Sequence, residues 1–96
     1  MSNGNLSLSQ KMRESIEKEI QHMRAAHKQV TTKDPQGEDL LLMSRSYLID
    51  AEDFYQKEQI MIAFEAIMIS WTYFDSALRL GLITIPKDLR AGFTVE

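Results

Sequence analysis

The sequence IMIAFEAIMISWTYFDSALRL, which occupies residues 60–80, decides the fold of this chain. Only Glu65, Asp75 and Arg79 are charged in it, so apolar side chains extend around most of a helix. At about 100° per residue they form two surfaces, each expected to be buried. The first, the Trp71 face, contains Ile60, Phe64, Ile67, Trp71, Phe74 and Leu78; the second, the Ile69 ridge, contains Ile62, Ala66, Ile69, Tyr73, Ser76 and Leu80.

The rest of the chain predicts two further helices with recognisable starts. Ser7 and Gln10 have the spacing of a capping box ahead of a narrow apolar stripe. Asp34 and Pro35 suit the N-cap and first position of a second helix. Gly81 suits the left-handed position after the third helix. We therefore predict helices over about 8–31, 35–57 and 60–80, followed by a tail over 82–96.

The connections between these helices are short, which favours antiparallel neighbours. Residues 57–59 contain neither glycine nor proline, so this boundary is inferred from the change of apolar pattern alone. No alternating strand pattern appears in the sequence. The prediction is an all-α fold: one domain over residues 1–96, an up-down-up three-helix bundle with an ordered C-terminal tail.

Composition narrows the classes of function. The chain has 96 residues, no cysteine and a net charge of -3, so disulfides, thiolate metal sites and a cysteine nucleophile are excluded. The acidic balance argues against binding to nucleic acid. The N-terminal residues lack the pattern of a signal peptide, and charges interrupt the apolar stretch. We expect a cytoplasmic protein without a membrane span.

Asp75 is the candidate buried polar residue. It lies at the border of the Trp71 face, where an unpaired carboxylate would cost several kcal/mol. Arg79, or the hydroxyl of Tyr47 or Tyr55, could supply a donor, and we interpret Asp75 as a structural polar anchor. No nucleophile, histidine base or glycine-rich loop accompanies it. We therefore predict no enzyme activity, no catalytic residues and no cofactor.

Two patterns suggest metal ligands without completing a site. Glu19 and His22 have the Glu-x-x-His spacing of di-iron bundles, but the chain lacks the second copy that such sites need. Asp50, Glu52 and Asp53 point in different directions around a helix. We predict no metal site within one chain and interpret His27 as a partly buried packing residue.

A set of residues from Tyr47 onward has a distinctive order and spacing: Tyr47, Asp50-Ala51, Phe54, Ala63-Phe64, Phe74-Asp75, the segment 78–82, Pro86, Leu89-Arg90 and Phe93-Thr94-Val95. In these residues the chain resembles a family of short archaeal helical proteins, the domain of unknown function 357. The resemblance implies a three-helix bundle and no known activity.

The Ile69 ridge has the four-three spacing of a coiled-coil seam and is left over once a bundle has buried the Trp71 face. Either the C-terminal tail covers it, through Ile83, Ile85, Leu89 and Phe93, or another chain does. We predict a non-enzymatic interaction or self-association module, with a homo-oligomer or another protein as partner. The alternative is a ligand- or metal-binding bundle completed across a dimer by Asp75, Glu19 and His22. The candidate interface residues are Leu42, Ile49, Ile62, Ile69, Tyr73 and Leu80.

Overall fold

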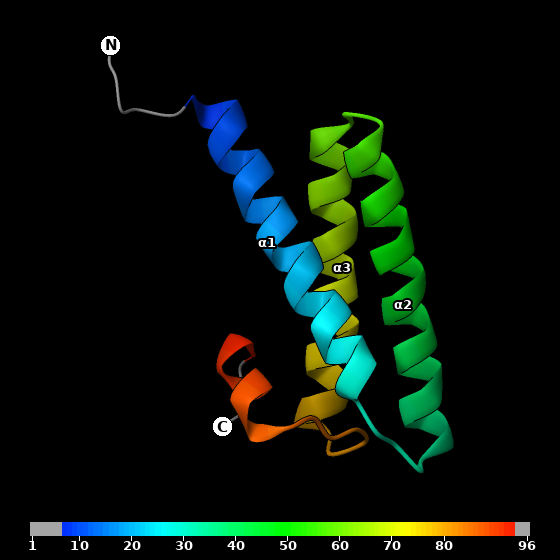
Figure 1. Cartoon of the computed structure of the whole chain (residues 1–96). Coiled ribbons are helices and arrows are strands. Elements are labelled where there is room, and N and C mark those ends of the chain that lie inside the picture. Colours follow the sequence, from blue (N-terminus) through cyan, green and yellow to red (C-terminus); the bar gives the residue numbers. More distant parts are fainter. Residues whose placement is uncertain (1–6, 94–96) are drawn as a thin grey trace.

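The computed structural model describes residues 7–93, and three long helices make up most of them. The helices α2 and α3 run antiparallel side by side, and α1 lies across the pair (Figure 1). Among the described residues there is no strand, so the predicted all-α three-helix bundle is confirmed. The elements are α1 (Leu8–Gln29), α2 (Pro35–Gln56), α3 (Ile60–Arg79) and a short 3-10 helix η1 (Lys87–Gly92).

Both predicted helix starts are confirmed. The Ser7 hydroxyl accepts from the Gln10 N–H at 3.1 Å, and the Gln10 side-chain oxygen accepts from the Ser7 N–H at 3.0 Å, which completes a capping box. The Asp34 carboxylate accepts from the backbone N–H of Gln36 at 2.8 Å, with Pro35 in the first helical position. The local chemistry of these residues is therefore sufficient to begin α1 and α2.

The helix α1 ends earlier than the predicted residue 31 because the next segment pairs with the tail. Thr31 and Thr84 exchange two backbone hydrogen bonds of 2.9 Å and form an isolated antiparallel bridge. Their hydroxyl oxygens lie 2.7 Å apart. This pairing needs an extended backbone at Thr31, which a helix does not allow.

The helices α2 and α3 end in the same six-residue hydrogen-bonding motif. After α3, the Leu82 N–H donates to the Ala77 carbonyl at 3.0 Å, and Gly81 has a φ of 73°. After α2, the Gln59 N–H donates to the Phe54 carbonyl at 2.9 Å, and Glu58 has a φ of 64°. Glu58 thus takes a conformation that favours glycine, which is why turn chemistry did not reveal this boundary.

The core lies between the three helices, and the Trp71 face of α3 supplies its centre. Phe74 and Ile67 are fully buried. Phe64 and Leu8, which the apolar pattern assigned to buried surfaces, are exposed. Figure 1 shows the reason: α1 diverges from the other two helices toward its N-terminal end. The buried apolar residues of the helices are Ile16, Ile20, Met23, Ala26, Leu41, Leu48, Ala51, Ala63, Ala66, Ile67, Phe74, Ala77 and Leu78.

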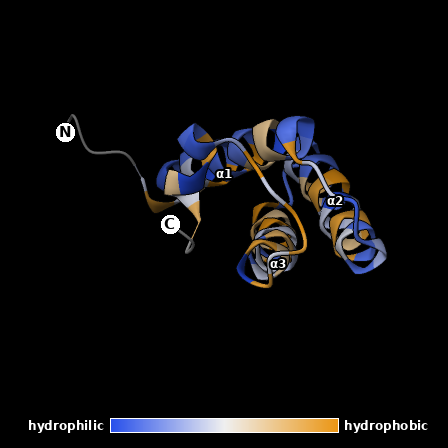
Figure 2. Ribbon diagram, turned by 90° about the horizontal axis from the view of Figure 1, so that it is seen from below, coloured by the Kyte–Doolittle hydropathy of each residue, from blue (hydrophilic) through white to orange (hydrophobic). Residues whose placement is uncertain are grey.

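The C-terminal tail packs on the α1 side of α3. The Phe93 ring lies 4.9 Å from that of His22 on α1 and 5.0 Å from that of Phe74 on α3, centroid to centroid. The Trp71 indole N–H donates to the Gly92 carbonyl at 3.3 Å. Seen from below, the described part of the tail lies beside α1, away from α2 (Figure 2). Residues 94–96, the end of the predicted tail, lie outside the described residues.

Candidate docking groove

The Ile69 ridge of α3 is exposed at its large apolar residues, whereas Ala66 is buried. Ile62, Ile69 and Leu80 are 44%, 38% and 69% exposed, and Tyr73 is half-buried. Of the two covers that the sequence left open, the tail is on the wrong side, because its residues up to Phe93 pack beside α1. Within residues 7–93, the tail therefore leaves the ridge uncovered.

The helix α2 supplies the other wall beside this ridge. Leu40, Met43, Tyr47 and Phe54 follow one another at helical spacings and form a line that we call the α2 seam. The Tyr47 ring stacks on the Tyr73 ring with centroids 6.1 Å apart and planes within 15°. This contact places the seam next to the Ile69 ridge, and the two lines together form the α2–α3 groove. Leu40, Tyr47 and Phe54 share one apolar face of α2 by their helical spacing, and the structure leaves all three half-buried.

The middle of the groove is hollowed. Leu40 of α2 and Ile69, Thr72, Tyr73 and Ser76 of α3 line a shallow depression of about 390 Å³. Both helices contribute apolar side chains, and three hydroxyl groups, those of Thr72, Tyr73 and Ser76, lie among them. This composition suits an apolar side chain of a partner better than a charged ligand.

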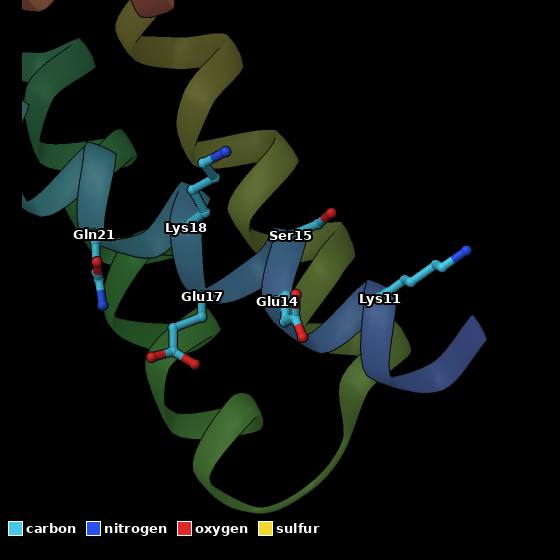
Figure 3. A pocket seen from close by; sticks show the side chains of 6 residues that line it. All are labelled: Lys11, Glu14, Ser15, Glu17, Lys18 and Gln21. Carbon is cyan, nitrogen blue, oxygen red and sulfur yellow. The ribbon is translucent and has the colours of Figure 1, made fainter. Parts of the chain in front are cut away.

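A second hollow, of about 670 Å³, has the opposite character. Its lining comes from α1 alone, so it has no opposing wall, and Figure 3 shows its six side chains projecting from that one helix. A surface without an opposing wall cannot enclose a ligand. Its lining residues are Lys11, Glu14, Ser15, Glu17, Lys18 and Gln21.

A buried hydrogen-bond cluster joins the three helices beneath the groove. The Ser44 hydroxyl of α2 donates to the Ser70 carbonyl of α3 at 2.8 Å, and the Ser70 hydroxyl donates to the Ser44 carbonyl at 2.7 Å. Since the Ser44 proton is used in this way, its oxygen accepts from the Nε2–H of His27 on α1 at 2.9 Å. The cluster satisfies both buried hydroxyls and connects α1 to the α2–α3 pair.

The geometry of His27 makes it a structural residue. Its ring packs edge-on against Phe74 at 5.0 Å, and its Nδ1 is buried without a hydrogen-bond partner. Burial lowers the pKa of His27 to about 4, and the charge of Arg45 acts in the same direction. Because Nε2 donates to Ser44, His27 cannot take the proton of that hydroxyl, and Ser44 is fully buried. The pair therefore lacks the arrangement of a nucleophile and its base.

Sequence reasoning identified His27 as a packing residue but missed the cluster. The available signal was the position of Ser44 among buried leucines and of Ser70 within the most apolar helix. Buried hydroxyl groups require hydrogen-bond partners. A serine on the core face of each of two neighbouring helices therefore indicates a hydrogen bond between the two.

Asp75 is buried, with 6% of its surface exposed. It follows Tyr73 by two residues and so lies across α3 from the Ile69 ridge, toward the tail. Asp75 and Arg79 each have an interaction partner within the protein. The suggested donor Tyr55 is engaged elsewhere, because its hydroxyl donates to the Glu17 carboxylate at 2.9 Å. The anchoring role of Asp75 remains a prediction.

Leu42 and Ile49 are also exposed, at 58% and 57%. At 100° per residue they lie on the side of α2 opposite the buried Ser44 and Ala51. The structure therefore does not bring them together with Ile62, Ile69, Tyr73 and Leu80, although all six were predicted interface residues.

Three of the suggested metal ligands, His22, Glu52 and Asp53, are used in packing or ion pairs. His22 packs against Phe93. Glu52 pairs with Arg24, and Asp53 pairs with Lys57 at 2.9 Å. Residues 7–93 contain no group of three or more histidine, aspartate or glutamate side chains placed to hold a metal ion.

Fold and surface together define a small three-helix bundle with an open apolar groove between α2 and α3. The fold is similar to that in the crystal structure of protein AF1782 from Archaeoglobus fulgidus, of the DUF357 family, with a TM-score of 0.74. The match covers 83% of this chain and all of the other chain, at 20% sequence identity. The likeness shows the fold, in agreement with the resemblance indicated by the sequence, and assigns no activity. Comparison with protein-family models and with curated proteins finds no match.

No helix within residues 7–93 combines the length and the apolar character needed to cross a membrane.

Proposed function

We propose that this protein is a non-enzymatic docking module that binds a helix of another polypeptide in the α2–α3 groove. The observation that carries the proposal is the exposed Ile69 ridge, which the chain's own tail leaves uncovered while burying the Trp71 side of the same helix. Helices commonly bind in such grooves through apolar residues that recur every three or four positions.

The dimensions of the groove support a helical ligand. The α2 seam extends from Leu40 to Phe54, about 21 Å at 1.5 Å per residue. That length matches about four turns of a partner helix. The central hollow between Leu40 and Tyr73 would accept one large apolar side chain, with the remaining contacts spread along the ridge.

The engagement of His27 and the burial of Ser44 and Ser70 support the non-enzymatic part of the proposal. The His27, Ser44 and Ser70 side chains are used up in joining the helices. We further propose a cytoplasmic location, supported by the lack of cysteine. A fluorescent fusion of the full-length protein found in the medium or at the membrane would contradict this location.

The docking proposal is tested by selecting random 16-residue peptides displayed on phage against the immobilised protein. Enriched peptides should show helical apolar periodicity and lose binding to the variant Ile69→Asp. The matched control is Leu42→Asp, which places the same charge on an exposed aliphatic position outside the groove. Circular dichroism establishes that each variant is folded, and Ile62→Asp serves as a second groove variant.

Two outcomes would overturn the proposal. One is that no peptide binds more weakly to the groove variants than to the control. The other is that binding depends on Leu42 and not on Ile69, which would place docking on the far side of α2.

A further inference from the structure

Three carboxylates flank the α2–α3 groove. Asp39 and Asp50 belong to α2 and Glu65 to α3, and all three are exposed. Each lies one helical turn from a residue of the groove: Asp39 is four residues before Met43, Asp50 three after Tyr47, and Glu65 four before Ile69. Acidic groups therefore accompany the apolar lines on both walls.

Few cations balance these carboxylates. Lys57, near the end of α2, is paired with Asp53 at 2.9 Å, and the two charges cancel. Arg79 lies at the opposite end of the groove, beside Leu80, and already has an interaction partner. The middle of the groove, around Tyr47 and Tyr73, thus has a negative border.

This border disfavours a second copy of the chain as the occupant. In a two-fold symmetric dimer, the same patch faces itself. Asp39, Asp50 and Glu65 would then approach the same residues of the other protomer, and like charges brought together at an interface weaken association.

We propose that the groove binds an amphipathic helix whose apolar stripe is bordered by lysine and arginine. The inference rests on the docking function proposed above and specifies the chemistry of the partner. Apolar side chains of the partner fill the hollow lined by Leu40, Ile69 and Tyr73, and its basic side chains lie over Asp39, Asp50 and Glu65. The charges supply orientation and selectivity, while the apolar contacts supply most of the affinity.

The test uses three synthetic 16-residue helical peptides with one identical leucine stripe. The flanking positions are lysine in the first, glutamine in the second and glutamate in the third. Fluorescence anisotropy measures binding of each labelled peptide to the full-length protein at low and at high salt. We expect the lysine peptide to bind about tenfold more tightly than the glutamate peptide at low salt, from three exposed charge pairs. The difference should shrink at high salt because exposed charges are screened.

The double variant Asp50→Asn with Glu65→Gln tests the assignment to these carboxylates. It should lose most of the preference for the lysine peptide. The matched control is Glu14→Gln with Asp88→Asn, which removes two exposed carboxylates elsewhere on the surface and should keep the preference. Ile69→Asp should weaken binding of the lysine and glutamine peptides alike.

The outcomes separate the two proposals. Equal binding of all three peptides that depends on Ile69 would contradict the proposal of a basic partner but remain consistent with docking in the groove. A preference for lysine that persists in the double variant would also overturn it. Binding that is insensitive to Ile69 would overturn both. Sedimentation of the protein alone that shows a dimer dissociated by Ile69→Asp would identify a second copy as the occupant and overturn the basic helix.

Discussion

The two apolar sides of α3 have similar compositions and different surroundings. Apart from the exposed Phe64, the Trp71 face is covered by α1 and by the tail, with Phe93 stacked on Phe74 at 5.0 Å. The Ile69 ridge, on the same helix, keeps Ile62, Ile69 and Leu80 exposed. The difference arises from the path of the chain after Gly81. There the Thr31–Thr84 bridge ties the tail to the end of α1. Apolar character alone therefore does not distinguish a core surface from an exposed one.

The largest expected effect on stability comes from truncating a buried side chain of the Trp71 face. Phe74→Ala should lower the free energy of unfolding by about 3–5 kcal/mol, because Phe74 is fully buried and its removal leaves a cavity. Urea denaturation followed by circular dichroism measures the change. Ile69→Ala is the matched truncation on the open side and should cost less than about 1 kcal/mol. Equal losses would contradict the distinction between the two sides.

Low pH should lower the free energy of unfolding through protonation of His27, which packs against Phe74. Its pKa is about 4 in the folded protein and about 6.5 when unfolded. The unfolded state thus binds the proton more readily, and stability falls as the pH drops from 6.5 to 4. The loss should be about 2 kcal/mol, after allowing for solvent that reaches part of the ring.

Urea denaturation across this pH range measures the effect, and His27→Gln is the control because it cannot titrate. Carboxylates titrate in both proteins, so the difference between them isolates His27. Parallel pH profiles for the two proteins would show that His27 is protonated without cost and would contradict the burial of its Nδ1 without a hydrogen-bond partner.

A methyl group at Gly92 should loosen the tail. The His22 ring occupies the place that a Cβ of Gly92 would take. Gly92→Ala should therefore force the ring or the tail to move, at a cost of about 1–2 kcal/mol. Trp71 is the only tryptophan, and its N–H donates to the Gly92 carbonyl, so its fluorescence should shift to longer wavelength. Ala91→Ser, at the exposed neighbouring residue, should leave the emission unchanged. An unchanged spectrum for Gly92→Ala would contradict the close packing of the tail on α1.

The smallest stability effect is expected on the open ridge. Ile69→Asp should change the free energy of unfolding by less than about 1 kcal/mol, since the side chain is already 38% exposed and the charge can remain in water. Thermal unfolding compared with Leu42→Asp measures this. A loss comparable to that of Phe74→Ala would mean that the ridge belongs to the core.

Local chemistry explains which parts of the fold could be predicted. Ser7 with Gln10 and Asp34 with Pro35 begin their helices through contacts within three residues. Gly81 ends α3 as expected. Glu58 ends α2 by the same motif without a glycine, so only the three-dimensional structure reveals its left-handed backbone. The Arg13 guanidinium holds the Glu58 carboxylate through two hydrogen bonds of 2.8 and 2.9 Å, a contact that links residues far apart in the chain.

The candidate groove was predictable only in part. The Ile69 ridge follows from helical spacing, because residues three and four apart share a face of one helix. The α2 wall of the groove does not follow from the sequence, since the Tyr47–Tyr73 stack depends on the register of two antiparallel helices. For Leu42 and Ile49, the sequence pattern predicted exposure correctly but not which surface they belong to. The direction in which they point depends on how α2 is rotated in the bundle.

The sequence by itself determined the three helices, their starts and the surplus of apolar surface on α3. These properties depend on interactions between residues close together in the chain, which are the same in any arrangement of the helices. Only the tertiary structure decided that the tail packs beside α1, that His27, Ser44 and Ser70 meet, and that the Ile69 ridge is open. Each of these depends on contacts between distant segments, whose choice of partner is set by packing and by hydrogen-bond satisfaction across the whole bundle.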